Sequence, residues 1–133
     1  MKLVEGGWPA GITVERTLPG HYYTDPATFQ RELERIWFDT WLCAGRVEQL
    51  PRTGDFFTRQ VGNESVIVVR NRREGISAFH NVCRHRGTRL CPVDAGNVKG
   101  GLIRCPYHSW TYDTTGGDLI ATPNIPDDVE GFD

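Results

Sequence analysis

The stretch CRHRGTRLCPVDAGNVKGGLIRCPYH, residues 83–108, decides how this 133-residue chain is interpreted. It begins and ends with a Cys–His pair: Cys83 with His85, and Cys105 with His108, with nineteen residues between the pairs. Each pair places a thiolate and an imidazole in one short loop, and both groups are metal ligands. The sequence therefore predicts a metal centre with four protein ligands that joins two loops.

The order of these ligands along the chain is Cys, His, Cys, His, whereas common zinc fingers place two cysteines first and two histidines later. The interleaved order suits a two-iron cluster, in which each loop gives its Cys to one iron and its His to the other. The alternative is a structural zinc site made by the same four residues, since zinc also accepts two thiolates and two imidazoles. Iron and acid-labile sulfide content separates these two alternatives.

Both loops resemble the cluster loops of a known family. CRHRG at 83–87 and CPYHSW at 105–110 are similar to those of Rieske non-haem iron oxygenases, the alpha subunits of ring-hydroxylating dioxygenases and related monooxygenases. The resemblance extends from about Leu18 to the C-terminus. It departs from the family at Ser109, where Gly is usual, and in a slightly longer spacer, whose extra length we expect in a flexible turn at Gly96–Gly101.

The resemblance implies a Rieske 2Fe-2S cluster, with Cys83 and Cys105 on the buried iron and His85 and His108 on the outer iron. It implies that a reductase or ferredoxin, drawing on NADH or NADPH, supplies single electrons. In the family these electrons reach a mononuclear Fe(II) in a downstream domain, usually of the neighbouring subunit in a homotrimer, where oxygen is activated for hydroxylation or demethylation.

The mononuclear iron of the family is held by two His and one carboxylate. This chain has no His after His108, so we expect it to transfer electrons without activating oxygen itself. A free-standing Rieske ferredoxin-type electron carrier is the alternative. The segment Leu18–Cys43 argues against that alternative, because a ferredoxin begins close to its first strand. Leu18–Pro26 and Arg59–Gly62 are similar both to family members that act on quaternary ammonium compounds and to members that act on aromatic acids.

The composition is that of an ordinary globular protein. Net charge is -2 and 38% of residues are hydrophobic, which indicates neither a nucleic-acid nor a membrane partner. The N-terminus carries no apolar signal-peptide core and no twin arginine, which predicts a cytoplasmic protein. In that reducing compartment Cys43 and Cys91, which lie outside the ligand loops, are expected to be free thiols.

The first predicted element is a helix that begins at Pro26. Asp25 can cap it, and Pro lacks the N–H that would be unpaired at the first helical position. An apolar stripe along the helix is expected to pack on the core, with charged residues on the opposite face. Residues 1–17 show no periodicity and are interpreted as an N-terminal arm. The stripe consists of Phe29, Leu33, Ile36 and Trp37.

After the helix, short apolar runs alternate with turn residues, which predicts a mainly β fold: a small antiparallel β-sandwich preceded by one helix. Residues 18–122 form the predicted cluster domain, with the ligand loops at the tips of two hairpins. The Pro-rich and acidic residues 123–133 form a linker toward a further domain. Strands are expected at 41–44, 55–61, 65–70, 76–81, 101–104, 109–112 and 119–121.

Two further features bear on redox chemistry. Trp110 stands two residues after His108, where high-potential respiratory Rieske proteins carry a Ser hydroxyl donor, and Tyr112 stands where they carry a Tyr donor. With one donor lost, the sequence predicts a low-potential centre. The stretch between the loops is also basic, with a single Asp94, and is expected to attract acidic partners. Its cations are Arg84, Arg86, Arg89, Lys99 and Arg104.

Overall fold

A computed structural model describes residues 17–123 and 125 of the chain. The predicted N-terminal arm and the linker at 123–133 lie almost entirely outside these residues. The described chain begins with a 3-10 turn η1 (Gly20–Tyr23) and the helix α1 (Pro26–Glu32), which continues as one π-helical turn, η2 (Leu33–Trp37). The carboxylate of Asp25 accepts hydrogen bonds from the backbone N–H of Ala27 and of Thr28, so the predicted cap is confirmed.

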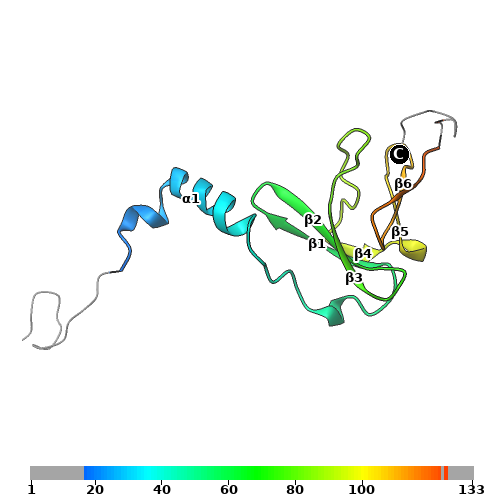
Figure 1. Ribbon diagram of the computed structural model, residues 1–133, viewed down its shortest axis with the longest axis horizontal. Helices are drawn as coiled ribbons and strands as arrows, with labels where there is room; N and C mark the ends of the chain where they lie inside the picture. The colour runs from blue at the N-terminus through cyan, green and yellow to red at the C-terminus, as the bar shows by residue number, and fades with distance from the viewer. Residues whose placement is uncertain (1–16, 124, 126–133) are drawn as a thin grey trace, which may run out of the picture.

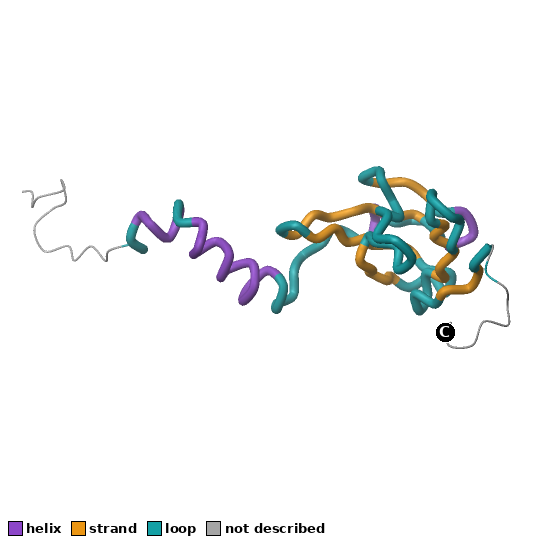
Figure 2. Tube along the Cα trace, turned by 90° about the horizontal axis from the view of Figure 1, so that it is seen from above, coloured by secondary structure: helices purple, strands orange, loops and turns teal. Residues whose placement is uncertain are grey.

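Three of the four residues of the apolar stripe are exposed, and only Leu33 is half-buried, so the prediction that the stripe packs on the core is wrong for the other three. Phe29 is 55% exposed, and Ile36 and Trp37 are also exposed. The helix lies at one end of the molecule, apart from the two sheets (Figures 1 and 2). Its end meets the sheet at Gly62, where an added Cβ would lie 2.9 Å from Leu33 Cδ2 and 3.1 Å from Phe38 Cζ.

A four-stranded antiparallel sheet follows, with strand order β3-β2-β1-β4 (Figure 1). The strand predicted at 41–44 is wrong: these residues are irregular, with Trp41 fully exposed, and lead into the 3-10 turn η3 (Val47–Gln49). The strands are β1 (Asp55–Val61), β2 (Glu64–Arg70), β3 (Ile76–His80) and β4 (Ala95–Asn97).

The sequence does not predict β4, because Ala-Gly-Asn has low strand propensity and the expected turn at Gly96–Gly101 overlaps it. It forms by pairing with β1, with Asp55 opposite Asn97 and Phe56 opposite Gly96. Gly96 allows the Phe56 ring to lie against the backbone, since a Cβ there would be 3.1 Å from Phe56 Cε1. The turn is therefore limited to η4 (Lys99–Gly101).

A second antiparallel sheet contains β5 (Leu102–Arg104), β6 (Thr111–Asp113) and β7 (Leu119–Ala121), in that order. The fold is mainly β, as predicted. The core lies between the sheets, where Ile67 and Val69 of β2 are fully buried and pack in one cluster with Ile103 and Tyr112. The opposite face of β2 packs through Val68 on Leu50 and Phe57. Alternate residues of one strand thus serve two apolar clusters.

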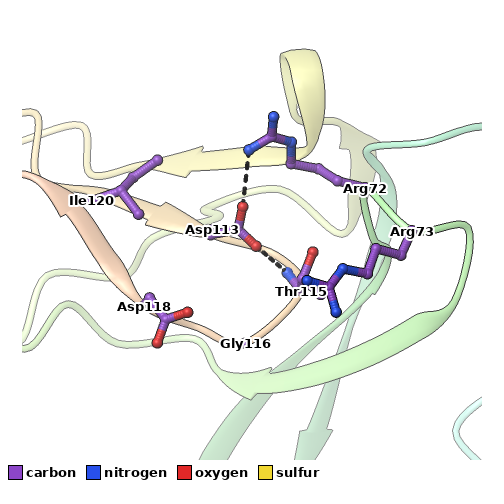
Figure 3. Close-up of a pocket in the computed structure, with 7 residues that line it drawn as sticks. All are labelled: Arg72, Arg73, Asp113, Thr115, Gly116, Asp118 and Ile120. Carbon is purple, nitrogen blue, oxygen red and sulfur yellow. Dashed lines mark hydrogen bonds and ion pairs between the residues drawn. The ribbon is translucent and has the colours of Figure 1, made fainter.

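An ion pair joins the turn after β2 to the end of β6 (Figure 3), and it lies in a pocket of about 580 Å³. Asp113 Oδ2 accepts a hydrogen bond from Arg72 Nη1 at 3.0 Å, and Asp113 Oδ1 accepts one from the Thr115 N–H at 2.6 Å. The Thr115 bond is the main cause that holds the pKa of Asp113 below its usual value. Since these charges are already paired, we interpret the pocket as a junction between the sheets.

Candidate metal centre

The first ligand loop is a tight turn. The Cys83 N–H donates to the Thr88 carbonyl at 2.8 Å, and the Gly87 N–H donates back to the Cys83 carbonyl at 2.9 Å. Gly87 has φ of 69°, a left-handed conformation that is unstrained only for glycine. His85 lies within this turn, two residues after Cys83.

The second ligand loop repeats this turn with different residues. The Cys105 N–H donates to the Trp110 carbonyl at 2.8 Å, and the Ser109 N–H donates to the Cys105 carbonyl at 3.1 Å. Ser109 occupies the left-handed position, with φ of 62°. The family departure at Ser109 therefore falls at the one position of the turn where a side chain is strained.

The ends of the two loops are held in different ways. The second loop is the tip of the hairpin β5–β6, as predicted, and Arg104 pairs with Thr111 directly below it. The first loop leaves β3 and returns to β4, which lies at the opposite edge of the sheet and pairs with β1. Its ends are therefore not joined by a strand ladder, and the prediction that this loop is the tip of a hairpin is wrong.

The two ligand thiols lie together inside the core. Cys83 and Cys105 are each 2% exposed and belong to the same buried cluster. Tyr112 Oη lies 3.2 Å from Cys83 Sγ and accepts a hydrogen bond from the Arg84 N–H. Tyr112 thus lies beside the sulfur, at the position where the sequence predicts a Tyr donor.

The surroundings of Cys83 favour its thiolate. Burial raises the pKa of this thiol, but the hydrogen bonds from Tyr112 and from the N–H of His85, with that of Cys105, more than offset it. The net pKa of Cys83 therefore lies below 9.0. Burial, with the bond to Cys83, raises the pKa of Tyr112 to about 12, so its hydroxyl stays protonated as a donor. A thiolate is the form that binds metal.

The two imidazoles form a second pair nearer the surface. His85 and His108 are half-buried, and their ring centroids lie 4.9 Å apart. Trp110 stacks on His85, with ring centroids 4.6 Å apart and an interplanar angle of 11°. The ring centroids of Tyr107 and His108 lie 3.8 Å apart. Sequence reasoning treated Trp110 only as the loss of a donor. Both aromatic residues come from the second loop, yet each supports a different ligand.

These donors fit a Rieske cluster. The Nδ1 atom of His108 is buried and has no hydrogen-bond partner among the described residues, as expected for a nitrogen reserved for a metal. No group of three or more His, Cys, Asp or Glu in the described part of the chain converges on one ion. The thiols pair inside and the imidazoles pair outside. This division suits two irons better than one zinc.

Burial lowers the pKa of His85, and the nearby His108 and Arg86 add to this effect. A neutral imidazole is the form that binds metal.

The other two cysteines lie outside the ligand loops. All four are free in the structure; Cys43 is exposed, and burial raises the pKa of Cys91 to about 11. Among the described residues, no helix has the length and apolar character to cross a membrane.

Comparison with known proteins connects this geometry to a family. Residues 40–132 match the Rieske [2Fe-2S] domain. The alpha subunit of biphenyl 2,3-dioxygenase from Rhodococcus jostii is 46% identical over 116 residues, which is 86% of this chain and 25% of that protein. The oxygenase subunit of glycine betaine monooxygenase from Chromohalobacter salexigens is 40% identical over 116 residues, 87% of this chain and 26% of that protein.

A solved structure agrees with these relatives. The apo form of a quaternary ammonium Rieske monooxygenase superimposes with a TM-score of 0.78 at 37% identity, covering 88% of this chain and 33% of that chain. The chain thus spans about a quarter of the length of the curated relatives. With a family match over most of its length and both ligand loops formed, this chain belongs to the Rieske [2Fe-2S] domain family, as found in the alpha subunits of Rieske oxygenases.

Proposed function

We propose that this chain is the electron-transfer domain of a Rieske oxygenase and that Cys83, His85, Cys105 and His108 hold its 2Fe-2S cluster. The observation that carries the proposal is the arrangement of these donors, two buried thiols beside two half-buried imidazoles, with His108 Nδ1 buried and unpartnered. When bound, such a cluster accepts and releases one electron at a time.

The protein residues around the ligands suit this function. The Tyr112 hydroxyl lies 3.2 Å from the Cys83 sulfur, and a hydrogen bond donated to that sulfur stabilises added negative charge. Trp110 and Tyr107 lie against the imidazoles and restrict their rotation. Because the imidazoles are nearer the surface than the thiols, their edges form the shortest route by which electrons enter and leave. A structural zinc site has no need of this asymmetry.

The oxygenase context is supported by the relatives and by the N-terminal helix. The relatives named above are oxygenase subunits, and the exposed stripe of Phe29, Ile36 and Trp37 is an apolar surface of the kind that packs against another domain. A lone ferredoxin-type carrier would gain nothing from it. We place the electron-transfer domain at residues 18–122 and a linker toward a catalytic domain at 123–133.

The proposed partners follow from this placement. A reductase or ferredoxin donates electrons, and a mononuclear Fe(II) site, in a neighbouring subunit of a homotrimer, accepts them to hydroxylate or demethylate an organic substrate. One solved relative, a quaternary ammonium Rieske monooxygenase, is described with inter-subunit electron transfer. Relatives that act on biphenyl and on glycine betaine match the same stretch, so the choice of substrate belongs outside this domain.

Anaerobic reconstitution of the chain with iron and sulfide tests the proposal. We expect equal amounts of iron and acid-labile sulfide, and an EPR signal that appears only on reduction by one electron. Stoichiometric zinc in the purified protein, with no uptake of iron or sulfide, would contradict the proposal. Paired histidines and a later carboxylate in the reading frame after Asp133 would support the oxygenase context, and an immediate stop codon would favour the carrier.

A further inference from the structure

A buried amide closes the first ligand loop. Asn81 follows β3, lies two residues before Cys83 and is 4% exposed. Its Oδ1 accepts a hydrogen bond from the Cys91 N–H at 2.7 Å, and its Nδ2 donates one to the Cys91 carbonyl at 2.7 Å. These are the two bonds that a residue in an antiparallel strand exchanges with the residue opposite. Here one side chain makes both.

The same residue is fixed to the sheet on its other side. The Asn81 N–H donates to the Ser65 carbonyl at 2.7 Å, and Asn81 Nδ2 also lies 3.2 Å from Ser65 Oγ. Asn81 thus connects strand β2 to Cys91, the residue where the chain leaves the first loop. The second loop has a strand pair below it, and the first loop has this amide in its place.

We propose that Asn81 is a positioning residue for the metal centre: by closing the first loop it sets Cys83 and His85 opposite the second loop. The proposal rests on the function proposed above. The hydrogen bonds of Asn81 go to Ser65 and Cys91 rather than to a ligand, so it acts through the backbone of the loop. Only a side chain amide offers a donor and an acceptor in one plane, so Asp supplies the acceptor alone and Ala supplies neither. Either change leaves buried groups of Cys91 without partners.

The chain offers a matched control at the opposite end of β3. Asn71 is 7% exposed, and its Oδ1 accepts hydrogen bonds from the N–H of Arg73 and of Gly75, each at 2.9 Å. Its Nδ2 donates to Ser77 Oγ at 2.9 Å. Asn71 therefore has the residue type, burial and bonding of Asn81 but closes the turn between β2 and β3, and none of its hydrogen bonds reaches a ligand loop.

The experiment compares Asn81→Ala and Asn81→Asp with Asn71→Ala and Asn71→Asp in the whole chain. The main readout is the rate at which a chelator removes iron from each reconstituted protein, set against its melting temperature. Partners that orient metal ligands typically contribute 10- to 100-fold to metal affinity. We expect loss of iron about 10-fold faster in the Asn81 variants than in Asn71 variants of equal melting temperature. Equal rates at matched stability would overturn the proposal.

Hydrogen exchange of the metal-free chain gives a second readout that needs no cluster. In the Asn81 variants we expect faster exchange of the Cys83 and Gly87 amides, with exchange in the second loop unchanged. Unchanged exchange in the first loop would also overturn the proposal. If the wild-type chain binds no iron, the proposed function fails while this readout still decides whether Asn81 holds the loop. If Asn81→Ala does not fold, the Asp variant carries both measurements.

Discussion

The two ligand loops form the same turn on different supports. Both have a cysteine N–H bonded five residues ahead and a left-handed residue four positions after the cysteine, Gly87 in one and Ser109 in the other. The first loop is closed by the Asn81 side chain and the second by the strand pair β5–β6. The imidazole also comes from a different position in each turn. The turn therefore places the thiolate and backbone, while its surroundings decide where the imidazole lies.

The largest effect should come from removing a ligand in either loop. Replacement of Cys83, His85, Cys105 or His108 by Ala should abolish the cluster, because the buried thiolates neutralise iron charge and the imidazoles complete the second iron. Iron and sulfide analysis after anaerobic reconstitution measures this loss. If variants of one loop kept near-normal iron and sulfide, the two loops would not be equal partners and the ligand assignment would be wrong.

The two loops also differ in their charge, which gives the next largest expected effect. The first carries Arg84 and Arg86, whereas residues 105–110 of the second carry no Lys or Arg. Since electrostatic steering raises association rates by 10-fold or more, we expect reduction by an acidic ferredoxin to slow about 10-fold from low to high salt. Arg86→Gln should remove part of this dependence, and Lys99→Gln, away from the ligand turns, is the control. Stopped-flow rates that do not change with salt would exclude steering by the first loop.

Tyr112 supports the sulfur of the first loop, so Tyr112→Phe tests that loop alone. The wild-type midpoint is expected near the lower end of the Rieske range, which runs from roughly -150 to +300 mV. Loss of a hydrogen bond to charged sulfur, about 1.5 kcal/mol, should lower the midpoint further by about 60 mV. Protein-film voltammetry at neutral pH measures both values. A wild-type midpoint well above zero would contradict the low-potential prediction, and an unchanged midpoint in the variant would remove Tyr112 from the sulfur environment.

The left-handed residue offers a smaller test of the shared turn. A Cβ added at Gly87 meets no atom within 4 Å, so Gly87→Ala should lower stability only through backbone strain, by about 1 kcal/mol. Ser109→Gly should relieve the same strain and raise stability by about 0.5 kcal/mol, less than the full strain because Gly also loses more entropy. Urea unfolding of the metal-free proteins measures both changes. Effects of the same sign at the two positions would show that the turns are not equivalent.

The smallest expected effect is on the pH dependence of stability, through one carboxylate in each sheet. A hydrogen bond from the Asn97 side chain is the main cause that lowers the pKa of Asp55 below 3.8, and Asp113 is lowered in the other sheet. A lowered folded-state pKa contributes stability that is full above the unfolded value and is lost as pH falls through the folded value. Asp55→Asn and Asp113→Asn should therefore flatten the loss of stability below about pH 4. A slope equal to that of wild type in acid urea titrations would contradict these shifts.

Local patterns of the sequence predicted most of the site and much of the fold. Ligand spacing, the Asp25 cap and the strand at 55–61 depend on residues close together in the chain, and the structure has the cap and the strand. The sequence does not predict β4, because Ala95–Asn97 has little strand propensity of its own and forms a strand by pairing with β1. The helix pattern identified an apolar face without identifying what covers it. Nothing in the spacing indicated that Asn81 bonds to Cys91, ten residues away.

The central claim is that both imidazoles and both thiolates bind one two-iron cluster. Pulsed EPR of the reduced protein, labelled with ¹⁵N-histidine, counts the imidazole nitrogens coupled to the cluster. We predict two coupled nitrogens in the wild type, and two again in His80→Ala, which removes an exposed imidazole outside the ligand loops. A single coupled nitrogen, or none, would contradict the assignment of His85 and His108 as paired ligands and with it the functional proposal.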